Sequence, residues 1–410
     1  MRSVNGPFLV MLAVAAAITT TKGTVEIVFP PYLVGYGYTL TLIGVITSLV
    51  AVVQLASRVP IGVAYRADRA ARQFAVALVA FGLSGSGFAF ADGHPVAVVA
   101  LTLVHGFAFG SAGTLGLALV IDITEGKRAG ASMAWYTAAI SAGYALGSIV
   151  GGTLADVIGI PATMGLIGLL PIVAALVVLA LPAIEGAPLP SDRGPGLGGL
   201  LRAGAKLDGR VWLAFVTVLY INLLWDSLDT FFVIFAPSVG ISLAVVGFLR
   251  ALKSGAAVFI RVTGAVLLEH IDHRRVTLVG VLAAGVTMVM LPTSSSMAVL
   301  VPAFVVLGLA RGVLRATSAA TIAELRSEGR DVGLASGVYN AGLDIGSIAG
   351  PVLGGAVASV IGIPQMFQAV ALMSLAAWLA VALSSARTRT AAGLNGLNVI
   401  PFRRAHLEDR

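Results

Sequence analysis

The 410-residue sequence has no cysteine, few histidines and little charge. Without cysteine, disulfides, iron–sulfur clusters and thiolate zinc sites are excluded. Only five histidines are present, so we expect no metal site and no cofactor. Charged residues make up 11% of the chain, less than half of the roughly 25% typical of a soluble domain. Such a chain cannot cover a water-exposed surface with charge, which favours a bilayer as its surroundings.

The sequence is instead rich in long apolar segments. It is 58% hydrophobic, and hydropathy together with helix breakers divides it into twelve candidate spans of membrane length. The predicted fold class is therefore an all-α membrane protein with twelve transmembrane helices. The first span is too long for a signal peptide, so we expect it to remain as a helix. The predicted spans are residues 7–34, 39–65, 74–91, 96–122, 130–157, 161–182, 211–236, 243–268, 276–293, 297–323, 332–361 and 363–385.

One long polar segment, residues 183–210, separates the sixth span from the seventh. It contains Pro188, Pro190 and Pro195 with several basic residues, a composition typical of a linker. We therefore expect an N-terminal six-helix lobe (1–182), a cytoplasmic linker (183–210), a C-terminal six-helix lobe (211–386) and a cytoplasmic tail (387–410).

The basic residues lie on one side of this topology. If the N-terminus is inside, all 26 lysines and arginines fall in inner segments or within spans, and the predicted outer loops have none. Lysine and arginine favour the cytoplasmic side, so the pattern predicts a multi-pass protein of the cytoplasmic (inner) membrane with both termini in the cytoplasm. The net charge of +7 is then topogenic, with some contact to lipid head groups, and we expect no nucleic-acid partner.

The chain contains an internal repeat. Residues 130–161 align without a gap to residues 333–364, at an offset of 203 positions that also relates Glu26 to Asp229 and Arg58 to Arg261. Each copy holds six spans, an even number, so the two copies run parallel about an axis along the membrane normal. That arrangement is typical of transporters with two rocking lobes.

Two six-span copies, a basic central linker and the loop after the second span together resemble the major facilitator superfamily. In that loop Gly62, Arg69 and Arg72 match the family pattern, whereas Arg66 stands where the family has an acid and Asp68 is displaced by two positions. The resemblance implies a monomeric carrier that is not an enzyme, with alternating access and a gating ion pair. If Asp68 supplies that pair, its geometry must differ.

A second motif lies in the eleventh span. Its glycines and proline match the pattern G-x8-G-x3-G-P-x2-G-G, which exporters of the drug/proton-antiporter branch carry in the fifth span. The resemblance implies proton-coupled export, and the alternative interpretation is close helix packing between the lobes. The residues are Gly337, Gly346, Gly350, Pro351, Gly354 and Gly355.

Apart from Asp122 and Asp156 near span ends, twelve charged or histidine side chains lie inside the predicted spans, and none is in spans 3, 6, 9 or 12. Each deeply placed charge costs about 2.5–3.5 kcal/mol on insertion scales, so these residues should face a shared cavity rather than lipid. In the superfamily spans 1, 4, 7 and 10 line that cavity. The residues are Lys22, Glu26, Arg58, His105, Asp226, Asp229, Arg250, Lys253, Arg261, Arg311, Arg315 and Asp344.

The cations and acids have two competing interpretations. The cations suit a carboxylate or phosphate, or they pair with the acids to hold the lobes together. The acids can load and release a proton in a low-dielectric cavity, or they are permanently paired. The candidate substrate-binding residues are Lys22, Arg250, Lys253, Arg311, Arg315, Asn222, Tyr136 and Trp225, and the candidate proton-coupling residues are Glu26, Asp226, Asp229 and Asp344.

Three further expectations concern individual side chains. The expected partner of Asp344 is Arg311 or Arg315. Arg58 and the repeat-equivalent Arg261 lie near the cytoplasmic end and are interpreted as structural. His105, a lone histidine, is more often a packing residue than a ligand.

The sequence therefore predicts a secondary active transporter of a small organic, anionic or zwitterionic solute, coupled to protons and working as an exporter. The alternatives are a proton-driven multidrug exporter, which would need an acidic and aromatic cavity, and a uniporter or exchanger. No G-x-x-x-x-G-K-[ST] motif is present, which argues against ATP-driven transport by this chain. An enzyme or receptor is disfavoured because no nucleophile or metal cluster accompanies His105.

Overall fold

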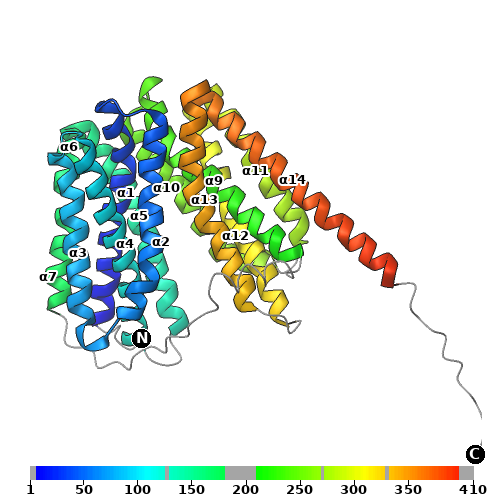
Figure 1. Cartoon of the computed structure of the whole chain (residues 1–410), viewed down its shortest axis with the longest axis horizontal. Coiled ribbons are helices and arrows are strands. Elements are labelled where there is room, and N and C mark those ends of the chain that lie inside the picture. The colour runs from blue at the N-terminus through cyan, green and yellow to red at the C-terminus, as the bar shows by residue number, and fades with distance from the viewer. Residues whose placement is uncertain (1–5, 125–128, 181–208, 269–271, 328–331, 397–410) are drawn as a thin grey trace, which may run out of the picture.

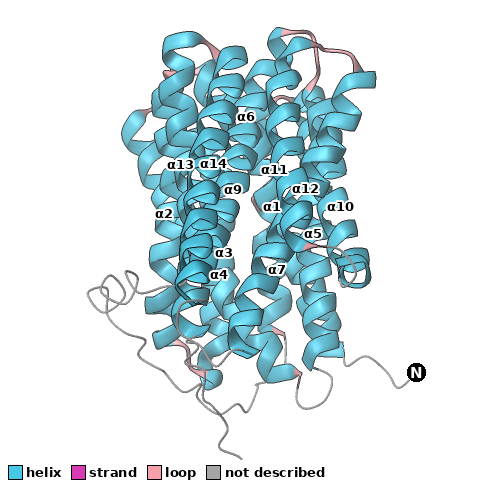
Figure 2. Cartoon of the chain, turned by 90° about the vertical axis from the view of Figure 1, so that its right-hand side faces the viewer, coloured by secondary structure: helices cyan, strands magenta, loops and turns pink. Residues whose placement is uncertain are grey.

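The computed structural model describes residues 6–124, 129–180, 209–268, 272–327 and 332–396. Every regular element in these ranges is a helix, and twelve spans are long and apolar enough to cross a membrane. The helices run side by side, with the connecting loops gathered at the two ends (Figure 2). The predicted all-α membrane fold is confirmed. Most of the predicted linker, residues 183–208, lies outside the described residues.

The first six spans form one lobe and the last six form the other (Figure 1). The N-terminal lobe comprises α1 Gly6–Gly35, α2 Leu40–Ala64, η1 Ala67–Arg69, α3 Ala70–Gly87, η2 Phe88–Phe90, α4 Pro95–Ile123, α5 Ala129–Ile158, α6 Ile160–Ile167 and α7 Leu169–Leu179. The C-terminal lobe comprises α9 Gly209–Ser238, α10 Leu243–Leu268, α11 His273–Met290, η4 Leu291–Thr293, α12 Met297–Ser327, α13 Val332–Ile361 and α14 Ile363–Gly396.

Two elements differ from the predicted spans. The sixth span is divided into α6 and α7 at Gly168, where a side chain would collide with α3: a Cβ there would lie 2.5 Å from the Gly82 carbonyl oxygen. The last helix, α14, continues to Gly396, beyond the predicted end at residue 385. The part of α14 that is apolar enough to cross a membrane is Ile363–Ser384, so the predicted span agrees and the helix continues past it with a polar sequence.

The repeat is visible as equivalent packing within the two lobes. In the N-terminal lobe Thr24 Oγ1 donates to the Gly147 carbonyl at 2.9 Å, which joins α1 to α5. In the C-terminal lobe Ser227 Oγ donates to the Gly350 carbonyl at 2.8 Å, which joins α9 to α13. Both members of the second pair lie 203 positions after those of the first.

The glycine face of α13 packs against α9 of its own lobe. A Cβ at Gly346 would lie 2.7 Å from the Leu219 carbonyl oxygen, and one at Gly350 would lie 2.7 Å from that of Leu223. The expectation that this motif packs between the lobes is therefore wrong for most of its residues. Only the end of the motif reaches the other lobe, where Pro351 and Gly355 contact α2.

The lobes meet at the end of the bundle where α1 ends and α2 begins, which we call the closed end. There a Cβ at Gly44 would lie 2.1 Å from the Pro351 carbonyl oxygen, and one at Gly247 would lie 2.1 Å from that of Ser148. Ser48 Oγ also donates to the Ile348 carbonyl at 2.7 Å. These contacts allow the backbones of α2 and α13, and of α5 and α10, to approach directly.

A carboxylate adds a polar contact at the closed end. Asp156, at the end of α5, accepts from the backbone N–H groups of Leu243 at 3.2 Å and Ala244 at 2.8 Å. These groups are the first of α10, which have no partner within their own helix. One lobe therefore caps a helix of the other.

Toward the opposite end, where α1 begins, the two lobes separate (Figure 1). Asn340 on α13 is exposed there, and a Cβ at Gly337 would meet no atom within 4 Å. The Arg58 side chain on α2 is 47% exposed. We call this the open end.

The glycine motif gives a test of this packing. We expect Gly350→Ala to destabilise the protein by roughly 1–3 kcal/mol, because the new methyl group would overlap backbone atoms of α9. Gly337→Ala, in the same motif, should leave stability unchanged because its surroundings are empty. Thermal unfolding of both purified variants in detergent measures the difference. Equal stability of the two variants would contradict the packing described here.

Candidate functional site

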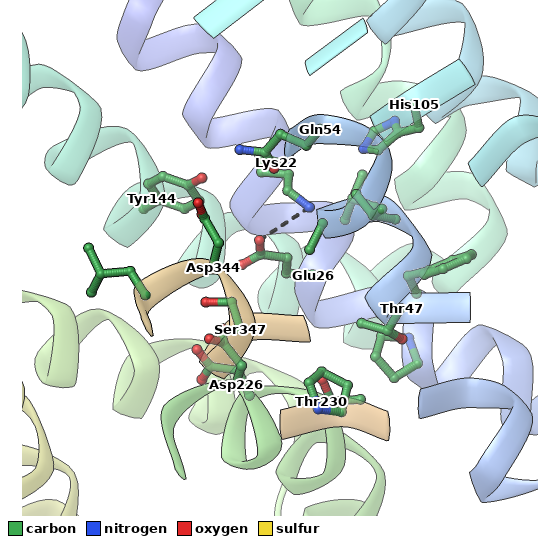
Figure 3. A pocket seen from close by; sticks show the side chains of 18 of the residues that line it. Lys22, Glu26, Thr47, Gln54, His105, Tyr144, Asp226, Thr230, Asp344 and Ser347 are labelled. Carbon is green, nitrogen blue, oxygen red and sulfur yellow. Dashed lines mark ion pairs between the residues drawn. The ribbon is translucent and has the colours of Figure 1, made fainter. Parts of the chain in front are cut away.

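A cavity of about 420 Å³ lies between the lobes (Figure 3). Its walls come from α1, α2, α4, α5, α9, α10, α12 and α13, so helices beyond the four expected from the resemblance contribute. The wall holds five basic and four acidic side chains in addition to His105. They are Lys22, Arg58, Arg250, Arg311, Arg315, Glu26, Asp226, Asp229 and Asp344.

Five charged side chains form a continuous chain of ion pairs across the interface between the lobes. Lys22 Nζ lies 3.3 Å from Glu26 Oε1 on the same face of α1. Arg250 Nη2 lies 3.0 Å from Glu26 Oε2, and its Nε lies 3.1 Å from Asp229 Oδ1. Lys253 Nζ lies 2.5 Å from Asp229 Oδ1. We call this series the interlobe charge chain.

Arg250 is the link between the lobes within this chain. Its planar guanidinium presents donors in two directions, so one side chain reaches both repeat-equivalent acids, Glu26 in one lobe and Asp229 in the other. The Arg250 side chain is only 6% exposed, and each acid keeps a lysine of its own lobe. The chain contains three cations and two acids, a net charge of +1.

The Trp225 ring lies behind the cavity wall and contacts two of the cations. Lys253 Nζ lies 3.6 Å from the Trp225 ring centroid, and the Arg311 guanidinium carbon lies 3.9 Å from it. Arg311 Nη2 also donates to Asn222 Oδ1 at 3.1 Å. Cation–π contacts of this kind stabilise a desolvated cation. They fix the orientation of Arg311 on α12.

Four residues proposed from the sequence as substrate ligands do not line the cavity: Asn222, Trp225, Lys253 and Tyr136. The first three support the charged wall from behind, and Lys253 is only 1% exposed. Tyr136 is buried within its own lobe beside Phe74. Spacing on a helix identified the right faces, but it could not show which side chains reach the cavity surface.

Asp344 pairs with a residue that the sequence did not indicate. Its Oδ1 lies 3.5 Å from Arg58 Nη1, whereas the expected partners were Arg311 or Arg315. The pair joins α13 of one lobe to α2 of the other, and both residues line the cavity. The interpretation of Arg58 as purely structural is therefore incomplete. Arg261, its repeat equivalent, lies in α10, and its side chain is outside those the structure describes.

Several cavity-lining side chains keep a shielded polar atom without a hydrogen-bond partner among the described residues. They include His105 Nε2, Asp226 Oδ2, Arg250 Nη1 and Arg315 Nε. The Ser347 side chain lies beside the Asp226 carboxylate in Figure 3, and both residues line the cavity. Sequence reasoning did not single out Ser347, although it lies three positions after Asp344 and thus near the same face of α13.

His105 is packed as the sequence suggested, although it also borders the cavity. Its ring lies 4.5 Å from the Phe81 ring centroid, and Nδ1 lies 3.2 Å from Ser84 Oγ. The residue is 1% exposed.

Two acids make contacts at the loop after α2. Asp68 pairs with the adjacent Arg69 at 3.5 Å, and both side chains are about two-thirds exposed. Tyr65 at the end of α2 instead donates from its hydroxyl group to Asp122 of α4. Burial, and then this hydrogen bond, raise the pKa of Tyr65 above its ordinary range, so the phenol stays protonated and the contact persists at physiological pH. Gly62 and Arg72 are exposed.

Comparison with known proteins gives a family and a fold. Residues 9–264 and 214–399 match the family model described as Major Facilitator Superfamily. The fold is similar to that of a bacterial homologue of the human lysosomal transporter Spinster, in an inward-facing and unoccupied conformation. That similarity has a TM-score of 0.75 and 14% identity, over 93% of this chain and 96% of that one.

A second similar structure is the nucleoside transporter NupG, with a TM-score of 0.75 and 13% identity over 93% of this chain and 99% of that one. At these identities the likeness concerns the fold alone. No curated protein matches the sequence.

The interlobe charge chain gives a test that depends on Arg250. We expect Arg250→Ala to remain folded, because the two lysines still neutralise Glu26 and Asp229, but to lose the link between the lobes. The closed end should then open more often. Because the chain has no cysteine, a single Ser148→Cys, buried at the closed end, can report this opening by its rate of labelling with a maleimide.

The labelling rate of Ser148→Cys should rise at least tenfold when Arg250→Ala is added, a change of about 1.4 kcal/mol in the opening equilibrium. Arg72→Ala in the same Ser148→Cys protein is the matched control, since Arg72 is exposed on α3. An unchanged rate in Arg250→Ala would show that this arginine does not hold the closed end together.

Proposed function

The chain belongs to the Major Facilitator Superfamily, and we propose that it is a secondary active transporter that exports a small organic anion or zwitterion in exchange for protons. As a member of this family with twelve membrane-length helices, it is a multi-pass membrane carrier of a solute. The solute class, the coupling ion and the direction are the proposed parts. So are its placement in the cytoplasmic membrane with both termini inside, and its action as a monomer.

Arg315 is the observation that carries the proposed solute class. It lines the cavity, its Nε has no hydrogen-bond partner among the described residues, and no ion pair to an acid is found for it there. Arg311 lies one turn away on the same helix and also lines the cavity. A guanidinium group matches the geometry of a carboxylate or phosphate, so this wall suits an anionic group of a solute.

The size and composition of the cavity support a small organic solute. Its volume of about 420 Å³ lies near the lower end of the range of roughly 300–1,000 Å³ for small-molecule sites. Phe29 and Phe88, whose ring centroids are 4.7 Å apart, give the wall an apolar part. Charged groups and aromatic rings together favour an organic ion over an inorganic one.

Proton coupling is supported by the acids, in particular by Asp344. Its ion-pair partner Arg58 belongs to the other lobe, so a proton on Asp344 would weaken one of the links between the lobes. Protonation would then change the free-energy difference between the two orientations of the lobes, which is the requirement for coupling. The glycine and proline pattern of α13, typical of antiporter-type exporters, supports export.

A multidrug exporter of lipophilic cations is the second candidate. The shielded Asp226 oxygen and the Phe29–Phe88 ring pair could accept such a compound. The five cations of the cavity wall weigh against it, because they would repel a positive solute unless every one of them stays paired.

The solute class can be tested with purified protein and a panel of acidic, zwitterionic and lipophilic cationic compounds. Ligand-induced thermal stabilisation should be confined to the acidic and zwitterionic members. Arg315→Gln should weaken their binding at least tenfold, because it removes the charge that faces their anionic group. Arg69→Gln, outside the cavity, should bind as the wild type does. Binding of lipophilic cations that survives Arg315→Gln would favour the multidrug exporter.

Proton coupling is tested in proteoliposomes with a trapped pH indicator and a solute that binds. Adding the solute should move protons in the wild type and in Asp92→Asn, a control with the same chemical change on an exposed residue outside the cavity. Asp344→Asn should reduce this movement at least tenfold. Solute flux without any proton movement in the wild type would instead identify a uniporter or exchanger.

A further inference from the structure

We propose that the solute is a zwitterion whose anionic group binds Arg315 and whose ammonium group binds Asp226, where it takes the place of a proton. This inference rests on the proposed function and narrows it. It assigns two opposite charges to two positions in the cavity, and it explains why export of the solute would be linked to proton entry.

Asp226 differs from the three other acids of the cavity wall. Glu26, Asp229 and Asp344 each have a basic group within 3.5 Å. The Asp226 Oδ2 atom, by contrast, is shielded from solvent and accepts no hydrogen bond from the described residues. A shielded carboxylate oxygen without a donor costs free energy that either a proton or a ligand N–H group removes. Asp226 therefore offers one acceptor for which a proton and an ammonium group compete.

Charged and titratable groups on five helices surround Asp226. They include two cations, two acids, a hydroxyl group and a phenol: Arg311 and Arg315 of α12, Asp229 of α9, Glu26 of α1, Ser347 of α13 and Tyr144 of α5. Arg311 attracts the ionised carboxylate, whereas Glu26 and Asp229 repel it. These opposing influences allow Asp226 to change its protonation state when a cationic group enters or leaves.

Competition at Asp226 requires a positive group on the solute. A solute with only negative charge does not compete with a proton for this oxygen, so its exchange for protons would depend on other groups, such as the Asp344–Arg58 pair. A solute with an ammonium group excludes the proton from the same oxygen, so the two travel in opposite directions. As the solute enters, the Asp226 O–H bond breaks, the proton passes to water, and the ammonium N–H donates to Oδ2.

Arg315 supplies the complementary charge from the same lobe. It lies on α12 and Asp226 lies on α9, so rocking of one lobe against the other does not separate them. The two residues interact electrostatically across the cavity wall that both line. The N-terminal lobe contributes Tyr144 and Glu26 to the same cavity. One lobe can therefore hold both poles of the solute while the other opens and closes over it.

Sets of three matched compounds test the inference. Each set contains an α-, β-, γ- or δ-amino acid, its N-acetyl derivative, which keeps only the negative charge, and its amide, which keeps only the positive charge. Thermal stabilisation measures binding, and proton release is recorded in weakly buffered detergent solution. We expect binding and proton release with at least one amino acid, binding at least tenfold weaker with both derivatives, and no proton release in Asp226→Asn. Asp92→Asn, at an exposed residue outside the cavity, should release protons as the wild type does.

Other outcomes separate this inference from the proposed function. Equal binding of the N-acetyl compounds, without proton release and insensitive to Asp226→Asn, would overturn the zwitterion and leave an anion transporter. If only the amides bind, and Arg315→Gln does not change their binding, both this inference and the proposed function are overturned. The inference is also overturned if no amino acid binds at about 10 mM, a concentration at which even weak recognition of two charges should be detected. Acidic compounds of the earlier panel could still bind and leave the proposed function standing.

Discussion

The central constraint on this protein is that charged side chains between two lobes inside a membrane need a partner of opposite charge in every arrangement of the lobes. Arg250 meets this constraint by pairing with one acid of each lobe, Glu26 and Asp229. Lys22 and Lys253 give each acid a second partner that moves with it. Separation of the lobes would leave both acids paired and only Arg250 with fewer contacts. Desolvating an unpaired charge costs several kcal/mol, so these local partners keep the opening of the closed end within reach of thermal energy and solute binding.

The repeat supplies a symmetric framework around an asymmetric site. The hydrogen bonds of Thr24 and Ser227 to the helices they support are equivalent, and so are the glycine faces of α5 and α13. Arg311 and Arg315 correspond instead to Ala108 and Ala112 in the first copy, and Asp226 corresponds to Gly23. The copies therefore share their helix packing, and they differ in the side chains that face the solute. A rocking mechanism needs the first property, and selective binding needs the second.

The sequence predicted the helices and the level of the charged residues better than it predicted their partners. Hydropathy located twelve spans because each must be apolar over a fixed length. Lys22 and Glu26 lie four positions apart on one helix, and this spacing by itself brings their side chains together. Spacing did not join Arg58 to Asp344, because that distance depends on how α2 and α13 are rotated and shifted against each other. Whether the Asp226 Oδ2 atom has a hydrogen-bond donor likewise depends on several neighbouring helices at once, so no single segment of the sequence can show it.

The cap that Asp156 places on α10 has a consequence for the side of the membrane that it faces. The contact joins a carboxylate to the positive end of a helix dipole at a surface in contact with the outer medium. When the lobes part, water can hydrogen-bond to the released N–H groups, so the contact can break and reform without trapping a bare polar group. Dissolved ions also weaken attraction of this kind, with a screening length of about 8 Å at physiological ionic strength. In the proposed orientation this surface faces the outside of the cell, so the salinity there would be one of the variables that set how long the carrier stays closed on that side.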